Sequence, residues 1–118
     1  MTIRVPIIQG GMGVGVSLHP LASAVAEEGG VGIISSACLD RLVSKRHNKK
    51  IDSYQAAYEE VSLAKARGGF AGINIMCALA KDYEASVRGA LDAGPDRREP
   101  AGELADVEGA DVDAVRAV

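Results

Sequence analysis

The sequence predicts an α/β protein with a parallel sheet, formed by three strand–helix units that follow one another along the chain. Three short apolar segments, at 5–9, 31–35 and 70–76, each precede a stretch in which apolar residues recur at helical spacing. A glycine pair stands directly before the second and the third apolar segment. The length of 118 residues suits one ordinary domain. We therefore expect right-handed β-α-β crossovers.

In the first unit, Val5 to Gln9 is expected to form a buried strand that opens directly into glycines. Pro20 suits the first turn of a helix, with Ser17 or His19 before it as the cap. The helical spacing is carried by Leu21, Ala24, Val25 and Glu28. Gly29 and Gly30 are expected to end this helix.

In the second unit, residues 31–35 read as a strand covered on both faces. Residues 39–50 are basic and polar, and we interpret them as a solvated loop in preference to a phosphate site. Asp52 and Gln55 then have the spacing of a capping box, which predicts a helix that ends at Gly68-Gly69. The expected buried face of that helix consists of Tyr54, Tyr58, Val61 and Ala64.

In the third unit, residues 70–76 form the strand, and Asp82 is expected to cap a helix that ends at Gly94. The face of this helix is Tyr83, Val87, Ala90 and Leu91. Residues 95–118 differ in character, since they are rich in Asp, Glu, Arg and Ala and contain no Ile, Phe or Tyr. We therefore divide the chain into a folded part, 1–94, and a divergent acidic tail, 95–118, that is either disordered or weakly helical.

Composition excludes several classes of function. The net charge of −3 gives no basic face for nucleic acid. There is no apolar stretch long enough for a bilayer and no secretory signal pattern, so we expect a cytoplasmic protein without a membrane partner. Cys38 and Cys77 do not form a disulfide framework, and we interpret them as buried thiols with no metal or redox role.

The glycines after the first strand do not fit the common nucleotide motifs. A Rossmann site needs G-x-G-x-x-G and an acidic residue at the end of the next strand. Gly11-Met12-Gly13 lacks the third glycine at the required position, and the second strand ends in Ile34-Ser35-Ser36. A P-loop is excluded because Gly-Lys-Ser/Thr does not occur.

A flavin site at the mouth of a parallel barrel fits better. The carboxyl ends of parallel barrel strands share one face, where the chemistry takes place. Gly10 to Gly13, Ser35-Ser36 and Asn74 would all lie at or near that face. Asn74 is polar within an otherwise apolar strand, so its amide either meets a ligand or ties neighbouring loops together.

Several segments resemble the nitronate monooxygenase family, formerly called 2-nitropropane dioxygenase. The resemblance rests on Pro6-Ile7-Ile8-Gln9-Gly10-Gly11-Met12-Gly13, on residues 21–26 and on residues 29–35. Residues 72–76 and 82–94 extend it in the same order. The flavin-dependent enoyl-acyl-carrier-protein reductases share the same opening and are the alternative family.

The resemblance implies a (β/α)8 barrel carrying FMN, of which this chain holds the first three units. It implies that the backbone of Gly11, Met12 and Gly13 lies along the isoalloxazine ring and that Asn74 contacts the flavin. The implied reaction is oxidation of an alkyl nitronate with dioxygen to a carbonyl compound and nitrite.

The catalytic half of such a barrel has no counterpart here. The family's catalytic histidine has no counterpart at His19 or at His47. We interpret His19 as a loop or cap residue and His47 as part of the basic loop. No catalytic residue is therefore assigned. The expected fourth strand is replaced by charged sequence from Pro95 onward, which a shifted reading frame would explain. Three units leave two open sheet edges, so the non-catalytic alternative is a half-barrel remnant that associates with itself.

Overall fold

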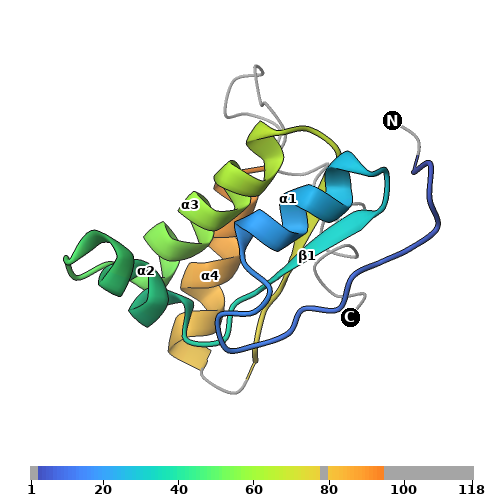
Figure 1. The fold of residues 1–118 in the computed structure, drawn as a ribbon. Helices are drawn as coiled ribbons and strands as arrows, with labels where there is room; N and C mark the ends of the chain where they lie inside the picture. The colour runs from blue at the N-terminus through green and yellow to red at the C-terminus, as the bar shows by residue number, and fades with distance from the viewer. Residues whose placement is uncertain (1–2, 78–79, 95–118) are drawn as a thin grey trace, which may run out of the picture.

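The computed structural model describes residues 3–77 and 80–94; the tail predicted for 95–118 lies outside this range. Along the described chain each strand lies between helices, and two consecutive helices connect the first strand to the second (Figure 1). The elements are α1 (His19–Glu27), β1 (Val31–Ser35), α2 (Leu39–His47), α3 (Ser53–Ala66), β2 (Phe70–Asn74) and α4 (Ala80–Asp92). The predicted α/β class is confirmed, with β1 and β2 parallel and in register from Val31↔Phe70 to Ser35↔Asn74.

The predicted first strand runs alongside β1 in the parallel sense, but it is neither regular nor buried. The Val31 N–H donates to the Ile7 carbonyl over 2.9 Å, and the Gln9 N–H donates to the Val31 carbonyl over 2.9 Å. These two bonds make only an isolated bridge, Ile8↔Val31. Ile7 and Ile8 are 60% and 63% exposed, because no described segment covers their outer side. The prediction of a buried strand over 5–9 is therefore wrong.

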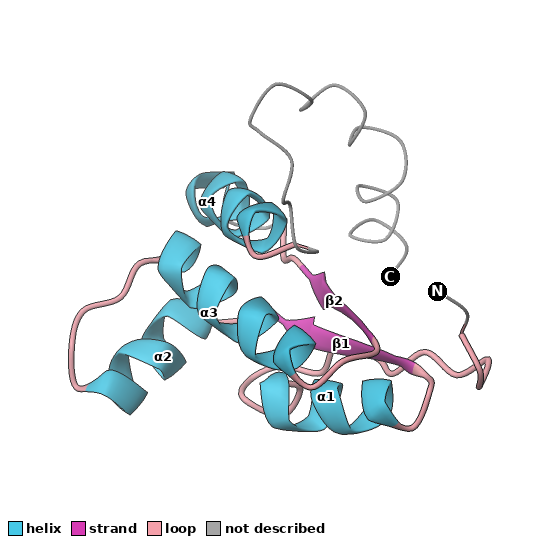
Figure 2. Cartoon of the chain, turned by 90° about the horizontal axis from the view of Figure 1, so that it is seen from above, coloured by secondary structure: helices cyan, strands magenta, loops and turns pink. Residues whose placement is uncertain are grey.

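The helices pack on the sheet, with α3 at the centre of the layer (Figure 2). Ile34 of β1 and Ile73 of β2 are partners in the register, and both lie in the core against α3. The remaining buried core is mostly alanine and valine, which lets helix and strand backbones approach closely. At Gly32 an added Cβ would lie 1.9 Å from the Ala22 carbonyl oxygen of α1, so only glycine fits there.

The solvated loop predicted for 39–50 is wrong over 39–47, where the chain forms α2. Leu39 and Val43 are one helical turn apart, and both are buried in the core. The start of this helix carried no recognisable signal, because its N-cap residue, Cys38, has a left-handed conformation and makes no side-chain cap hydrogen bond. Lys45, Arg46 and His47 lie in the last turn, where positive charge interacts favourably with the helix dipole.

The predicted cap of α3 is confirmed, and that of α4 is wrong. The Asp52 carboxylate accepts a hydrogen bond from the Gln55 N–H over 2.8 Å. The predicted buried face of α3 holds only in part, since Tyr58 is 42% exposed. The helix α4 already begins before Asp82, whose carboxylate accepts a hydrogen bond from the Ser53 hydroxyl over 3.0 Å. Asp82 therefore links α4 to the start of α3.

Candidate functional site

The loop that follows residues 5–9 lies across the carboxyl ends of β1 and β2. A Cβ added at Gly11 would lie 2.8 Å from the Asn74 Cβ, and one added at Gly13 would lie 2.6 Å from the Ala37 Cβ. Both positions are therefore limited to glycine by the strand ends beneath them. Met12, between the two glycines, is 49% exposed. The structure thus places Gly11 directly against Asn74, with Met12 at the surface of the same loop.

The loop presents bare main chain at Gly10. A Cβ added at Gly10 would meet no atom within 4 Å. The N–H groups of Gly11 and Gly13 form no hydrogen bond within residues 3–77 and 80–94. Free main-chain donors in a glycine-rich loop can hydrogen-bond to a flat, polar ring system such as a flavin. The residues present therefore fit the group that the sequence suggested.

The loop is held in place by the buried hydroxyl of Ser17, which is 0% exposed. This hydroxyl donates to the Gly10 carbonyl over 3.1 Å and accepts from the Met12 N–H over 2.9 Å and from Gln9 Nε2 over 2.8 Å. One donated and two accepted bonds exhaust its capacity. The cap role expected for Ser17 is wrong, since Leu18 is the N-cap residue of α1. The loop geometry is therefore set by the protein before any ligand binds.

Sequence reasoning did not single out Gln9, whose side chain continues the pairing with β1. Its Nε2 donates to the Ile33 carbonyl over 3.2 Å, and its Oε1 accepts from the Ile33 N–H over 3.4 Å. The side-chain amide of Gln9 thus makes the hydrogen bonds to the Ile33 backbone that a neighbouring strand would otherwise make. The available signal was a polar residue at the end of an apolar run, immediately before the glycines.

The loops after β1 and β2 are also joined to each other. The Ser36 N–H donates to the Asn74 carbonyl over 3.0 Å, and the Ser36 hydroxyl accepts from the Met76 N–H over 2.9 Å. A cavity of about 150 Å³ opens beside these loops and is lined by residues that include Ser36, Cys38 and Met76. Sites for drug-sized ligands usually measure about 300–1,000 Å³. A flavin ring therefore does not fit inside this cavity, and the glycine loop is the better surface for it.

The prediction that both cysteines are buried is wrong. Cys38 and Cys77 are free and exposed. Cys38 lies between β1 and α2, and Cys77 follows β2. Among the described residues, no group of three or more His, Cys, Asp or Glu side chains could hold a metal ion.

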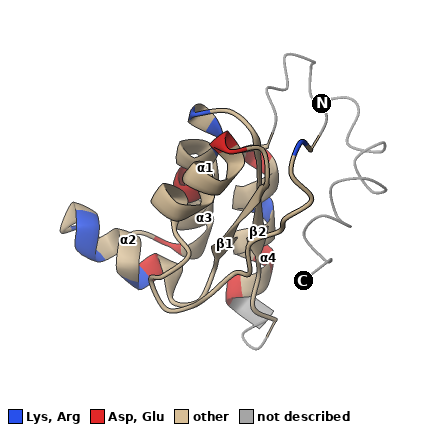
Figure 3. Cartoon of the chain, turned by 45° about the vertical axis from the view of Figure 1, so that its right-hand side comes forward, with Lys and Arg blue, Asp and Glu red and all other residues tan. Residues whose placement is uncertain are grey.

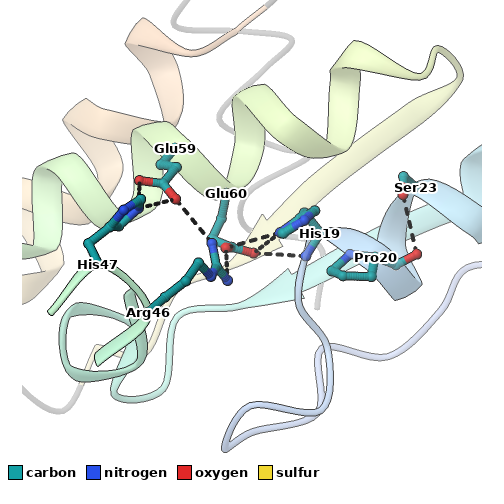
Figure 4. Close-up of polar contacts among 7 residues, drawn as sticks. All are labelled: His19, Pro20, Ser23, Arg46, His47, Glu59 and Glu60. Atoms are coloured by element: carbon teal, nitrogen blue, oxygen red, sulfur yellow. Dashed lines mark hydrogen bonds and ion pairs between the residues drawn. The ribbon is translucent and has the colours of Figure 1, made fainter. Parts of the chain in front are cut away.

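A second polar cluster joins α1, α2 and α3 (Figure 4). At its centre is Glu60 of α3, whose side chain is fully buried. Its Oε2 accepts from the His19 N–H over 2.8 Å, and the His19 ring Nδ1 lies 3.1 Å from the carboxylate. Arg46 Nη2 lies 2.5 Å from Glu60 Oε1. The carboxylate therefore caps α1 from another helix and pairs with α2.

Glu59 takes the outer half of the same cluster. It lies 2.8 Å from His47 Nε2 and 3.0 Å from Arg46 Nη1. His19 is the first residue of α1, and His47 is the last residue of α2. The predictions that His19 is a loop or cap residue and that His47 lies in a loop are therefore both wrong. Both imidazoles are bound to carboxylates of α3. These contacts give the two histidines a structural role.

Arg46 and Tyr54 have shifted pKa values. Burial lowers the pKa of the Arg46 guanidinium, but hydrogen bonds and charge from Glu60 and Glu59 raise it more, so the net shift is upward. The pKa of Tyr54 is raised chiefly because its hydroxyl donates to the Asp92 carboxylate over 2.8 Å. Neither group lies on the glycine loop.

Parallel strands with crossover helices, and a glycine loop at their carboxyl edge, define the class of this protein as parallel α/β. The family model described as nitronate monooxygenase matches residues 1–90. The chain belongs to the nitronate monooxygenase family, as the residues quoted from its sequence indicated. No curated protein and no solved structure matches the chain. Within the described ranges, no helix is long and apolar enough to cross a membrane.

Proposed function

We propose that this chain is an FMN-binding oxidoreductase of nitronate monooxygenase type, containing the first three units of a (β/α)8 barrel. The proposal is supported by the family match over residues 1–90. It is supported further by the glycine loop at the carboxyl ends of the strands, the face on which such barrels carry their chemistry. The observation that carries the proposal is the contact of Gly11 with the end of β2 beneath a bare loop surface.

In this proposal Gly11, Met12 and Gly13 lie along one face of the isoalloxazine ring, and Asn74 contacts it from β2. The unpartnered N–H groups of Gly11 and Gly13 orient the ring. When bound, FMN supplies the electron chemistry, for which the proposed substrates are an alkyl nitronate and dioxygen and the products a carbonyl compound and nitrite. A cytoplasmic location belongs to the proposal and rests on the sequence alone.

We assign no catalytic residue within the chain. A base that acts on a substrate must lie within hydrogen-bond reach of it. The chain contains two histidines, and His19 and His47 are bound to Glu60 and Glu59. We therefore expect flavin binding to be more pronounced than turnover. In the extreme case, the chain is a half-barrel remnant that has no activity.

The proposal is tested by titrating the purified chain with FMN and following flavin absorbance and fluorescence. Gly10→Leu should abolish the spectral change without altering the far-UV circular dichroism, because its side chain enters the open space above the loop. The matched control is Gly68→Asn, which also meets no atom within 4 Å and keeps the left-handed conformation that asparagine tolerates.

Three results would count against the proposal. A parent chain that gives no spectral change with FMN would refute flavin binding. Equal FMN affinity in the parent and in Gly10→Leu would refute the location of the ring. Reduction of an enoyl thioester by a nicotinamide cofactor, without oxygen uptake on nitronate, would replace the proposed reaction by that of the enoyl-acyl-carrier-protein reductases.

A further inference from the structure

The outer edge of residues 6–10 has main-chain groups without partners. In the bridge to β1, the Ile7 carbonyl and the Gln9 N–H point toward Val31. Because peptide groups alternate along an extended chain, the Ile8 N–H and carbonyl point away from β1. Neither group forms a hydrogen bond with the part of the chain that the structure describes. This segment is therefore an edge on which another strand can be added.

The same segment exposes an unusual amount of apolar surface. Four large side chains are about half exposed or more: Ile3 at 46%, Ile7 at 60%, Ile8 at 63% and Met12 at 49%. A standard interface buries about 800 Å² on each partner, of which somewhat more than half is apolar, so a cluster of exposed apolar residues is suited to form one. Residues 5–16 carry no charge, and most charged residues lie on the helices (Figure 3).

We propose that a second copy of this chain pairs with this edge. The two edges run antiparallel about a two-fold axis at Ile8, which faces Ile8 of the second copy. Each Ile8 N–H donates to the Ile8 carbonyl of the other copy, and the two side chains become cross-strand neighbours. A two-fold interface covers the apolar segment on both copies at once, whereas pairing with the other edge of the sheet, at β2, would leave one segment exposed.

The hydrogen bonds of the loop favour this register. In it, Pro6 faces Gly10 of the other copy, and proline has no N–H to donate. The Gly10 carbonyl needs no donor, because it already accepts from the Ser17 hydroxyl over 3.1 Å and from the Met12 N–H over 3.0 Å. The Gly10 N–H forms no hydrogen bond within the described residues, and in this register it donates to the Pro6 carbonyl. A register in which Pro6 faced Ile8 of the other copy would leave the Ile8 carbonyl without a donor.

Sedimentation velocity over a range of concentrations tests the proposal on the full chain. The parent should form dimers, and Ile8→Asp should weaken the dimer at least tenfold, because it buries a charge beside a charge. Ile8→Asp should keep its circular dichroism, since the side chain is 63% exposed. Leu63→Asp is the matched control: Leu63 is 39% exposed on α3, away from this edge, and its replacement should leave the dimer unchanged.

A short bis-maleimide tests the register in a chain in which Cys38 and Cys77 are replaced by serine. Cysteine at position 8 should give a cross-linked dimer, because directly opposed residues lie about 5.5 Å apart at Cα. Cysteine at position 63 should give none. A parent chain that stays monomeric would overturn the proposal. A dimer that survives Ile8→Asp, or one that cross-links at 63 and not at 8, would do the same.

Discussion

The buried carboxylate of Glu60 should contribute far more to stability than its neighbour Glu59. Both residues lie on α3, and each contacts one histidine and Arg46. They differ in burial, because the Glu60 side chain is 0% exposed and the Glu59 side chain is 28% exposed. The comparison therefore measures burial together with the hydrogen bond that Glu60 accepts from the His19 N–H.

The magnitude follows from what each substitution leaves behind. Glu60→Ala removes the acceptor of the His19 N–H and leaves Arg46 without its inner partner. Breaking a buried pair costs about 3–5 kcal/mol, and we expect about 3 kcal/mol here because the Arg46 side chain, 33% exposed, can turn toward water. Glu59→Ala breaks only exposed pairs and should cost about 0.5 kcal/mol. Helix propensity changes equally in both variants, so it cancels in the comparison.

Urea unfolding followed by circular dichroism at 222 nm measures both variants. With a slope of about 1.5–2 kcal/mol per molar urea, Glu60→Ala should lower the midpoint by about 1.5–2 M. Glu59→Ala should lower it by about 0.3 M. Equal midpoints for the two variants would refute the reasoning, since burial would then have no effect. A loss below about 1 kcal/mol for Glu60→Ala would show that Arg46 and His19 find other partners.

Three further predictions concern separate parts of the fold. The raised pKa of Tyr54 means that the folded state holds the phenolic proton more tightly, so the stability it contributes is present below about pH 10 and lost above it. Tyr54→Phe, which removes the bond to Asp92, should flatten the alkaline limb of a stability–pH curve; an unchanged limb would contradict this. Gly32→Ala should cost about 3 kcal/mol or more in thermal unfolding, because its Cβ would collide with the Ala22 carbonyl, and a normal melting curve would disprove the contact. Asp52→Ala should cost about 1 kcal/mol and Asp52→Asn much less, and equal losses would show that the cap hydrogen bond is unimportant.

Sequence reasoning succeeded where local signals and tertiary packing agree. The glycine pairs before β1 and β2, the apolar runs that follow them and the Asp52 cap predicted elements at nearly their observed bounds, whereas the apolar run over 5–9 did not form a regular strand. It failed at α2, because the buried pair Leu39 and Val43 is surrounded by basic residues and the start at Cys38 lacks a capping side chain. Tertiary contacts determine that this segment is a helix, and no local sequence pattern indicates those contacts.

The candidate site was predictable only in part. The position of the glycines after an apolar run indicated a bare loop at a strand end, and Asn74 stood out as a polar residue inside a strand. The roles of Ser17 and Gln9 depend on which peptide groups the fold brings beside them, so spacing alone did not reveal them. The exposed cysteines were misjudged for the same reason, since exposure depends on how the helices cover the strand ends.

The contact between His19 and Glu60 joins residues that are 41 positions apart. The first helix of the chain is thus completed by a side chain from the second unit, and neither unit has its full set of hydrogen bonds alone. A chimaera whose junction falls between them would leave a buried carboxylate facing foreign sequence. The smallest piece that evolution or an engineer can exchange intact therefore extends at least from α1 through α3.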